Sequence, residues 1–363
     1  MIHFVVGTRA QLLKLAPVMV DCERRGLEWR WVYTAQHRDT VQQIVETFEL
    51  PPPAFVVVRW ETEAKSKGAM ARWMTRMLLA LPRSSRVLDG KTGPRNVVVT
   101  HGDTFTTWLA ALMGKLTRTK VLHVESGLRS FNLREPFPEE INRLITFRLA
   151  DYYACQDEEA IHNLRRRKGV KLNTHGNTQI DTLRFGIERS GTIAVEVPDE
   201  PFAVATIHRY ENIFDAERLR RIVEQINQIA QDRLVLFIQH PATRIQLEKL
   251  GLLDELEQSP GVRLLPRLEY LPFIATVRRA EFVISDGGGN QVELYYLGKP
   301  TLIFRDDVEQ QEGIGDNAVL SRLDPAVIQG FLDRYPTLAR EPRLPDTSPT
   351  QTIVDFLVDR GFG

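Results

Sequence analysis

The sequence predicts an α/β protein with parallel sheets. Short apolar, β-branched runs are each followed by a polar or Gly-containing turn and then by a longer segment of helical period. This alternation is typical of strand–helix–strand units whose sheets are covered on both faces. A length of 363 residues is more than one hydrophobic core usually serves, which favours two domains with a cleft between them. The predicted strands are residues 1–6, 29–33, 96–100, 120–124, 202–206, 234–238, 282–285 and 301–304.

The expected domain boundary lies in the least regular part of the sequence. Residues 173–201 contain several glycines and prolines and end in Val-Pro-Asp-Glu-Pro, which is typical of a linker. We therefore expect a first domain over residues 1–172 and a second over residues 173–350. Residues 351–363 carry a helical period after a Pro-rich segment, so a terminal helix is expected to pack away from the second core and back on the first domain.

Composition excludes several classes of protein. The 47 Lys+Arg residues balance the 47 Asp+Glu residues, so the chain has no basic footprint for nucleic acid and no charge run long enough to be an interaction tail. The sequence has no signal-peptide pattern and no apolar stretch near the roughly 18 residues of a membrane span. Cys22 and Cys155 lack zinc-site spacing. We expect a cytoplasmic protein with no structural metal and no nucleic-acid or membrane partner.

Polar residues follow the predicted strands in both halves of the chain. In parallel sheets, ligands bind beyond the carboxyl ends of strands, so polar strand ends from both halves indicate one shared cleft. These positions hold Gly7-Thr8-Arg9, Gln36-His37-Arg38, residues 101–104, residues 125–127, His208-Arg209, His240-Pro241 and residues 286–289.

The Gly run at residues 286–289 lies between a strand and a predicted helix. Free backbone N–H groups and the positive end of the helix would face one point there, which is an anion site. The run is neither a Walker A motif nor a GxGxxG fingerprint, and a tight loop without a ligand is the alternative. Glu293, one turn into the helix, could accept hydrogen bonds from ribose hydroxyls.

Three carboxylates of the first half, Asp103, Glu125 and Glu139, lie at strand ends or in a loop. Each alone would ordinarily be a solvated turn residue. If they converge with Arg9, His123 and Arg143, they raise one another's proton affinity while the nearby cations keep at least one of them ionised. That combination suits acid/base chemistry near neutral pH.

The second half has its own candidates. His208 and His240 follow strands, where they are either hydrogen-bonded structural residues or ligands of a diphosphate. No histidine has HxH or HxxxH spacing, so we expect no metal centre. Tyr270 and Phe273 lie in a segment that we expect to be a loop, where they either stack on a nucleotide base or anchor the loop to the core.

Taken together, these motifs resemble the non-hydrolysing UDP-N-acetylglucosamine 2-epimerase family. The resemblance covers nearly the whole chain, and its motifs in this order are specific as a set. They are GTRAQLLKLAPVM at 7–19, TAQHRDTV at 34–41, HGDT at 101–104, HVESGLRS at 123–130, PFPEEINR at 136–143, HGNTQID at 175–181, TIHRYEN at 206–212, QHP at 239–241, YLPF at 270–273, DGGGNQVE at 286–293 and EQQEG at 309–313.

The resemblance implies the GT-B fold, with two Rossmann-like domains facing a central cleft, and a homodimer. It also implies a reaction without cofactor or metal, in which UDP is eliminated to leave a 2-acetamidoglucal and adds back after inversion at C2. The implied catalytic residues are Asp103, Glu125, Glu139 and His208. The implied substrate-binding residues are Arg9, Lys14, Arg143, Phe273, Gly288, Gly289, Glu293 and Gln310. The implied allosteric residues are Gln36, His37, Arg38 and His240.

Several positions depart from the family pattern. Ala10-Gln11 stands where Pro-Glu is usual, Gly287 replaces a serine, and Val292 replaces a glutamate. Gln310-Gln311 lies in the segment where the family has an arginine expected to contact the nucleotide sugar.

Because of these departures, several substrates and functions stay open. The chain is expected to epimerise UDP-GlcNAc and UDP-ManNAc for surface polysaccharide, or a related UDP-2-acetamido sugar. A glycosyltransferase that uses a UDP-sugar and a non-catalytic sensor of nucleotide sugars are the other classes.

Overall fold

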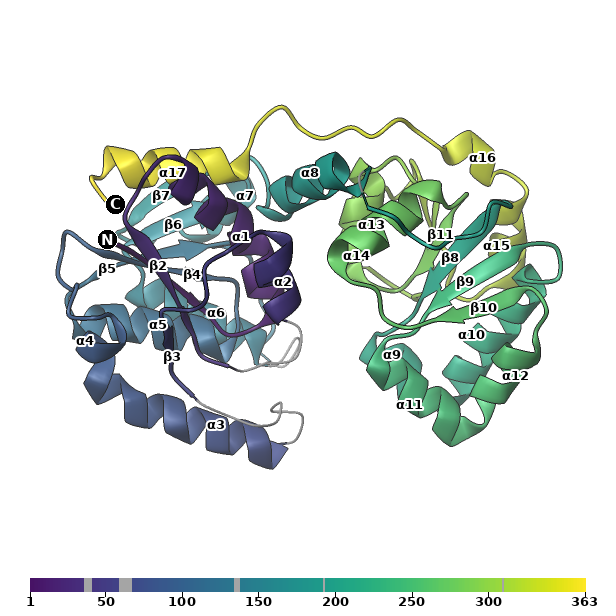
Figure 1. Cartoon of the computed structure of the whole chain (residues 1–363), viewed down its shortest axis with the longest axis horizontal. Coiled ribbons are helices and arrows are strands. Elements are labelled where there is room, and N and C mark those ends of the chain that lie inside the picture. Colours follow the sequence, from purple (N-terminus) through teal and green to yellow (C-terminus); the bar gives the residue numbers. More distant parts are fainter. Residues whose placement is uncertain (36–40, 59–66, 134–137, 192, 309) are drawn as a thin grey trace. The chain divides into compact units, whose positions relative to one another are not determined.

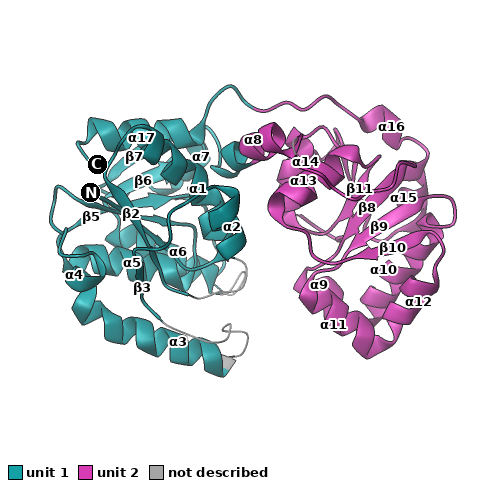
Figure 2. Cartoon of the chain, viewed as in Figure 1, with its two compact units in different colours: residues 1–182, 345–363 teal, residues 183–344 magenta. Residues whose placement is uncertain are grey.

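The computed structural model describes residues 1–35, 41–58, 67–133, 138–191, 193–308 and 310–363. The chain forms two compact units, coloured separately in Figure 2: unit 1 is residues 1–182 with 345–363, and unit 2 is residues 183–344. Within the described residues, no helix is both long enough and apolar enough to span a membrane.

Unit 1 is built on a seven-stranded, fully parallel sheet in the order β3-β2-β1-β4-β5-β6-β7 (Figure 1). β1 and β4 are buried along their whole length, as expected for central strands covered on both faces. The strands are β1 (Ile2–Val6), β2 (Trp29–Tyr33), β3 (Phe55–Val56), β4 (Val97–His101), β5 (Lys120–Val124), β6 (Tyr152–Cys155) and β7 (Val170–Asn173). The helices are α1 (Arg9–Arg24), α2 (Val41–Thr47), α3 (Lys67–Ala80), α4 (Ser84–Val87), α5 (Phe105–Leu116), α6 (Glu139–Leu149), α7 (Glu158–Asn163), the first part of α8 (Gln179–Ser190), and α17 (Pro349–Asp359).

Unit 2 repeats the design with a six-stranded parallel sheet in the order β10-β9-β8-β11-β12-β13. The strands are β8 (Phe202–Thr206), β9 (Leu234–Ile238), β10 (Val262–Leu265), β11 (Val283–Ser285), β12 (Thr301–Ile303) and β13 (Ala318–Leu320). The helices are α9 (Tyr210–Ile213), α10 (Ala216–Ile229), α11 (Pro241–Leu250), α12 (Leu252–Gln258), α13 (Tyr270–Arg279), α14 (Gly288–Tyr296), α15 (Pro325–Leu332) and α16 (Tyr335–Leu338).

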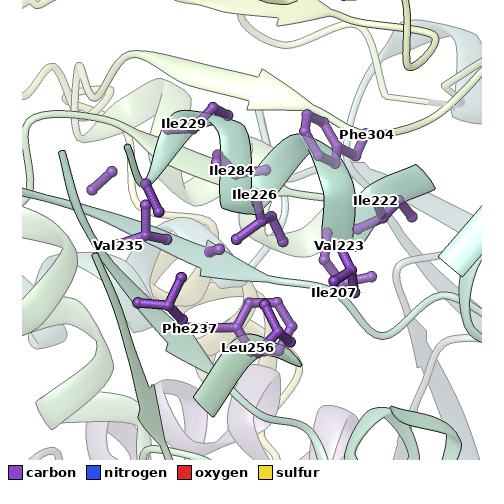
Figure 3. Close-up of a cluster of buried hydrophobic side chains, with 14 of the residues drawn as sticks. Ile207, Ile222, Val223, Ile226, Ile229, Val235, Phe237, Leu256, Ile284 and Phe304 are labelled. Atoms are coloured by element: carbon purple, nitrogen blue, oxygen red, sulfur yellow. The ribbon is translucent and has the colours of Figure 1, made fainter. Parts of the chain in front are cut away.

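Helix α10 illustrates how the sequence builds the core of unit 2. Asp215 caps its first turn by accepting hydrogen bonds from two backbone N–H groups. Its apolar residues recur at helical spacing and are buried against the sheet. Figure 3 shows this cluster, in which Ile222, Val223, Ile226 and Ile229 of α10 lie with side chains of the sheet and of α12: Val235, Phe237, Ile284 and Leu256.

The C-terminal helix α17 returns to unit 1, as predicted (Figure 2). It packs against α1, where Arg25 forms a 2.5 Å ion pair with Asp355. The ring of Phe356 meets Tyr152 edge-on at a centroid distance of 5.2 Å. The chain therefore crosses to unit 2 and comes back.

The observed division differs from the expected boundaries. Unit 1 continues past residue 172 because β7 completes its sheet and the next residues bind back to it: Thr182 donates to the carbonyl of Leu13 at 2.9 Å, and Asp181 accepts from the backbone N–H of Thr350 at 2.7 Å. The segment that we expected to be irregular contains α8. Glycines and prolines at its ends obscured this helix.

In both sheets the strand order reverses beside the first strand of the unit. The reversal lies between β1 and β4 in unit 1 and between β8 and β11 in unit 2. Ligands of doubly wound sheets bind at the carboxyl ends of the strands at this switch point. The residues that follow β1, β4, β8 and β11 are therefore the first place to look for a functional site.

Candidate functional site

In unit 1, Gln11 ties the ends of the two switch-point strands together. Thr8 caps α1, and the Gln11 side chain accepts from the N–H of Gly7 at 2.9 Å and donates to the carbonyl of His101 at 2.7 Å. It also lies 3.0 Å from the hydroxyl of Thr104. Gln11 stands where the family pattern has glutamate. Its amide can donate a hydrogen bond, which a carboxylate cannot.

The Glu125 carboxylate lies at the centre of a polar cluster beyond β5. Both of its oxygens accept from the Lys14 ammonium, at 2.9 and 3.1 Å, and Oε1 also accepts from Asn177 at 2.7 Å. His101 Nε2 lies 3.1 Å from Oε2. The backbone of Glu125 is left-handed, with φ of 61°, a strained state for a residue with a side chain. We attribute its persistence to these side-chain partners.

Asp103 has a separate partner on α6. Arg143 donates to Asp103 Oδ2 at 2.5 Å, and the neighbouring Asn142 donates to the Asp103 carbonyl at 2.8 Å. His123, the fourth residue of β5, has its Nε2 2.7 Å from the carbonyl of Gly102. Its Nδ1 lies 2.8 Å from the Ser126 hydroxyl, so Nε2 carries the proton and Nδ1 accepts.

Glu139 and Glu140 begin α6 and have different surroundings. Glu140 is fully buried and accepts from Arg129 Nε and from the N–H of Ser130, and it lies 3.6 Å from Arg143 Nη1. Glu139 Oε2 is buried but has no hydrogen-bond partner among the described residues. A buried carboxylate oxygen without a partner is costly, so this atom is a candidate contact for a ligand.

The electrostatics of unit 1 follow from burial. Burial acts to raise the pKa of Glu125, but Lys14, His101 and the hydrogen bonds from Lys14 and Asn177 outweigh it and lower this pKa to about 2. Burial lowers the pKa of His101 to about 3 and that of His123 to about 4. At neutral pH the cluster therefore pairs an ionised carboxylate and ammonium with two neutral imidazoles.

In unit 2, the buried Asp286 organises the ends of β8 and β11. It accepts from the backbone N–H of His208 at 3.0 Å and of Arg209 at 2.9 Å, and from the side chain of Asn212 at 2.8 Å. His208 Nδ1 lies 3.3 Å from Asp286 Oδ1, which orients the imidazole. Asn212 also donates to the carbonyl of Phe304 at 2.9 Å, so the whole turn is fixed to the sheet.

The Gly run forms the N-terminus of α14, as the spacing predicts, with Gly287 as its N-cap. A Cβ on Gly287 would lie 2.7 Å from Cε1 of His208, so only glycine leaves room for the ring in this position. A Cβ on Gly288 would lie 3.3 Å from Nη2 of Arg209 and 3.4 Å from Cγ of Gln310. Gln310 thus borders the helix N-terminus, where an anion would bind.

Two further predicted residues lie on the helices beside this turn. Glu293 is buried on α14, and its carboxylate together with burial raises the pKa of Tyr270 well above its usual value, with burial as the larger cause. The segment expected to be a loop is the first turn of α13, because Tyr270 and Leu271 are buried and anchor it as a helix. Phe273 on the same turn is half-buried. The ring of His240 lies 5.7 Å from that of His208.

The structure thus gathers the predicted residues into one group per unit. Unit 1 holds Arg9, Lys14, Asp103, Glu125, Glu139 and Arg143, and unit 2 holds His208, His240, Phe273, Gly288, Gly289, Glu293 and Gln310. Gln36, His37 and Arg38 lie outside the described residues. No group of three or more His, Cys, Asp or Glu side chains suited to a metal ion occurs in the described part of the chain.

Sequence reasoning gave no role to four residues of these groups: His101, Glu140, Asn177 and Asp286. Each lies inside a quoted motif and at or near the end of a strand or the start of a helix. Their position in these motifs could have indicated them. Their side chains bind other protein groups, however, and spacing along the sequence does not reveal those contacts.

Together, two parallel α/β units with polar groups at their switch points define an enzyme with the GT-B fold. A family model described as UDP-N-acetylglucosamine 2-epimerase matches residues 21–335. The chain belongs to this family.

Curated relatives and solved structures agree with this membership. A UDP-N-acetylglucosamine 2-epimerase of Salmonella borreze is 32% identical over 94% of this chain and 90% of the relative. A UDP-2,3-diacetamido-2,3-dideoxy-D-glucuronate 2-epimerase of Pseudomonas aeruginosa is 32% identical over 85% of this chain and 84% of the relative. The crystal structure of Methanocaldococcus jannaschii UDP-GlcNAc 2-epimerase in complex with UDP-GlcNAc and UDP superposes with a TM-score of 0.80 at 26% identity, over 99% of both chains.

Proposed function

We propose that this protein is a non-hydrolysing epimerase that interconverts UDP-GlcNAc and UDP-ManNAc. The observation that carries the proposal is the group of three carboxylates, Asp103, Glu125 and Glu139, with cations on the same edge of the unit 1 sheet. A sensor that only binds a nucleotide sugar has no need for this set. Family membership favours an epimerase over a transferase.

The proposed reaction needs a proton acceptor and a site for the departing diphosphate. A base removes the C2 proton, the C1–O bond to UDP breaks, and the electron pair forms the C1=C2 bond of the glycal. In the reverse step UDP adds at C1 and a proton adds at C2 from the opposite face. No net redox change occurs, so the reaction needs no electron carrier.

We assign different roles to the three carboxylates. Glu125 is held ionised by Lys14 and Asn177, with a pKa of about 2, so it orients and stabilises charge rather than carrying a proton. Glu139 has a buried oxygen without a described partner, and Asp103 has Arg143 on one oxygen. These two are the proposed proton carriers, one for each face of C2.

Unit 2 supplies the proposed UDP site. The N-terminus of α14 presents backbone N–H groups and a positive helix end to a diphosphate. His208, oriented by Asp286, borders this turn, and we assign it the role of stabilising the departing UDP. Glu293 and Phe273 are the proposed contacts to the ribose and the base.

A proton-exchange experiment tests the function. The purified protein is incubated with UDP-GlcNAc in deuterated water, and the sugar is followed by NMR. We expect deuterium at C2 together with the manno epimer, and loss of both in Glu139→Gln but not in Glu248→Gln, which changes an exposed carboxylate of α11. Absence of both signals with the unchanged protein would exclude UDP-GlcNAc as the substrate.

A related UDP-2-acetamido sugar is the second candidate substrate, and two observations favour it. Gly287 and Gln310, which remove a hydroxyl and a guanidinium relative to the family pattern, both border the N-terminus of α14. The Pseudomonas aeruginosa relative acts, by its name, on a diacetamido glucuronate. Running the same NMR experiment with the diacetamido sugar nucleotide beside UDP-GlcNAc compares the two directly.

The cellular setting is proposed from the family resemblance. We propose a cytoplasmic homodimer whose product feeds surface polysaccharide. Light scattering of the purified protein tests the dimer. Activation by a second UDP-GlcNAc, for which His240 and residues 36–38 were candidates, stays a prediction. Activity measured at rising UDP-GlcNAc tests it, since such activation gives a sigmoidal rate curve.

A further inference from the structure

A basic pocket lies at the amino-terminal edge of the unit 1 sheet. Three of its lining residues begin strands: Lys120 begins β5, Tyr152 begins β6 and Val170 begins β7. Asp103 and Glu125 of the proposed active site follow the opposite ends of β4 and β5. The pocket has a volume of about 500 Å³, large enough for a small molecule, and is separate from the site described above.

Its lining is strongly cationic in a chain whose net charge is zero. Five cations line the pocket: Lys120, Arg148, Arg166, Arg167 and Lys168. One acid, Asp151, also lines it, but this carboxylate already binds Lys115 at 2.9 Å and lies 3.8 Å from Lys120. A net positive potential therefore remains to attract an anion.

The loop that carries three of these cations is held in place by its own contacts. The N–H of Arg167 donates to the carbonyl of Leu164 at 2.8 Å, and Lys171 Nζ donates to the carbonyl of Gly169 at 3.0 Å. The loop also packs against β6 and the residue before it, since a Cβ on Gly169 would lie 2.4 Å from Cε2 of Tyr153 and 2.3 Å from the Asp151 carbonyl oxygen. The cations are thus presented on a fixed backbone, which lowers the entropy cost of binding.

Two of the cations are available for a ligand. Arg166 and Lys168 are exposed, and neither makes a hydrogen bond or ion pair within the described ranges of the chain. Arg360, which follows α17, adds a further positive charge nearby, because its guanidinium lies 5.7 Å from the ring centroid of Tyr152, which lines the pocket.

We propose that this pocket binds a small, multiply charged phosphate compound. Clustered arginines and lysines match the charge of a polyphosphate, and arginine pairs its N–H groups with two phosphate oxygens at once. The concave shape favours a free small molecule over a flat anionic surface. This site is independent of the epimerase proposal, because it shares no residue with either group of proposed active-site residues.

Calorimetric titration of the full-length protein with inorganic tripolyphosphate tests the proposal. With saturating UDP present to fill the proposed diphosphate site at α14, we expect saturable binding of tripolyphosphate with one site per chain. The double variant Arg166→Glu and Lys168→Glu should bind at least about tenfold more weakly, because two charge-assisted contacts become repulsive. Both side chains are exposed, so the variant should fold, which circular dichroism checks.

A charge-matched variant controls for general attraction. Arg220→Glu with Lys249→Glu changes the net charge equally on exposed positions of unit 2, and it should bind tripolyphosphate as the unchanged protein does. If both variants bind tripolyphosphate equally more weakly, the attraction comes from overall charge, and the proposed binding site is wrong. Binding to vesicles that contain phosphatidylserine, without binding of tripolyphosphate, would also overturn it, because the cations would then recognise a lipid surface.

Discussion

Arg143 donates to the Asp103 carboxylate at 2.5 Å while its other terminal nitrogen lies 3.6 Å from Glu140. One guanidinium thus lies between a carboxylate at 27% side-chain exposure and one that is fully buried. Glu140 also binds Arg129 and the N–H of Ser130. The position of Asp103 therefore depends on a carboxylate that we assign no part in the chemistry.

Replacing Glu140 with Gln should lower both stability and turnover. The amide keeps the shape but leaves Arg129 and Arg143 without their buried counter-charge, and losing one partner of a buried ion pair costs about 3–5 kcal/mol. Arg143 is then free to shift on Asp103, so kcat should fall about tenfold or more with a smaller change in KM. Urea unfolding and initial rates measure the two effects.

Tryptophan fluorescence makes the stability measurement specific to unit 1. All five tryptophans of the chain fall in its sequence range: Trp29, Trp31, Trp60, Trp73 and Trp108. The control is Glu248→Gln on α11, whose carboxylate is exposed. If Glu140→Gln unfolds like the unchanged protein and keeps its kcat, then Glu140 does not position Arg143.

Unit 1 should lose stability on mild acidification. The pKa of His101 is lowered to about 3 and that of His123 to about 4, from 6.5, chiefly by burial. Between the folded and unfolded pKa values the unfolded chain binds more protons, so stability falls as the pH drops below about 6.5. Each histidine adds up to about 1.4 kcal/mol per pH unit to this slope. The pKa of Glu125 is lowered to about 2 from 4.5, so Glu125 adds to the loss of stability below about pH 4.5.

His123→Gln checks this prediction. The amide can donate and accept a hydrogen bond, as the imidazole does with Gly102 and Ser126, but it does not titrate. A plot of the unfolding free energy of unit 1 against pH should therefore be less steep between about pH 6.5 and about pH 5. The decrease in slope should correspond to about one proton, or about 1.4 kcal/mol per pH unit. His162→Gln, at an exposed position of α7, is the control. An unchanged slope in His123→Gln would mean that His123 is protonated in the folded state.

The sequence predicted the central strands well because they are buried on both faces. Residues 29–33, 120–124, 202–206 and 234–238 are strands with the predicted bounds. The edge strands β3, β7, β10 and β13 were not predicted, since they are short or only half-buried. The internal strand β6, four residues long, was also not predicted. The first turn of α13 was taken for a loop, although Tyr270 and Leu271 are buried in it and Pro272 is tolerated in a first helical turn.

Candidate residues could be named from strand-end position, but their partners could not. Glu125 and Lys14 are 111 residues apart in sequence, and Asp286 and His208 are 78 apart. Which side chains meet depends on the parallel order of the strands and on helix packing, which spacing along the chain does not encode. The space that His208 occupies above Gly287 is likewise a property of two strands brought together.

Gly287→Ser should lower turnover by displacing His208. A side chain at residue 287 would place Cβ 2.7 Å from Cε1 of His208, so the imidazole must leave its position 3.3 Å from Asp286. The backbone of residue 287 has φ of −83°, which serine adopts without strain, so stability should change little. We expect kcat to fall at least about tenfold with a smaller change in KM, measured by initial rates.

Gly330→Ala is the matched control for this change. Gly330 lies on an exposed turn of α15, and nothing lies within 4 Å of a Cβ placed there. This variant should keep full activity and gain roughly 0.5–1 kcal/mol of stability. Unchanged or higher kcat in Gly287→Ser would show that His208 acts from another position than the one observed.

Gln310→Arg should tighten binding of a UDP-sugar if UDP-GlcNAc is the substrate. Cγ of Gln310 lies 3.4 Å from the place of a Cβ on Gly288, so an arginine there can reach an anion at the N-terminus of α14. A charge-assisted contact contributes about 1.5–3 kcal/mol, so KM for UDP-GlcNAc should fall about tenfold or more with kcat nearly constant. Gln329→Arg, the same change on an exposed face of α15, should leave KM as it is. If KM for UDP-GlcNAc stays the same in Gln310→Arg but KM for the diacetamido sugar nucleotide falls, the result favours the diacetamido sugar nucleotide as the substrate.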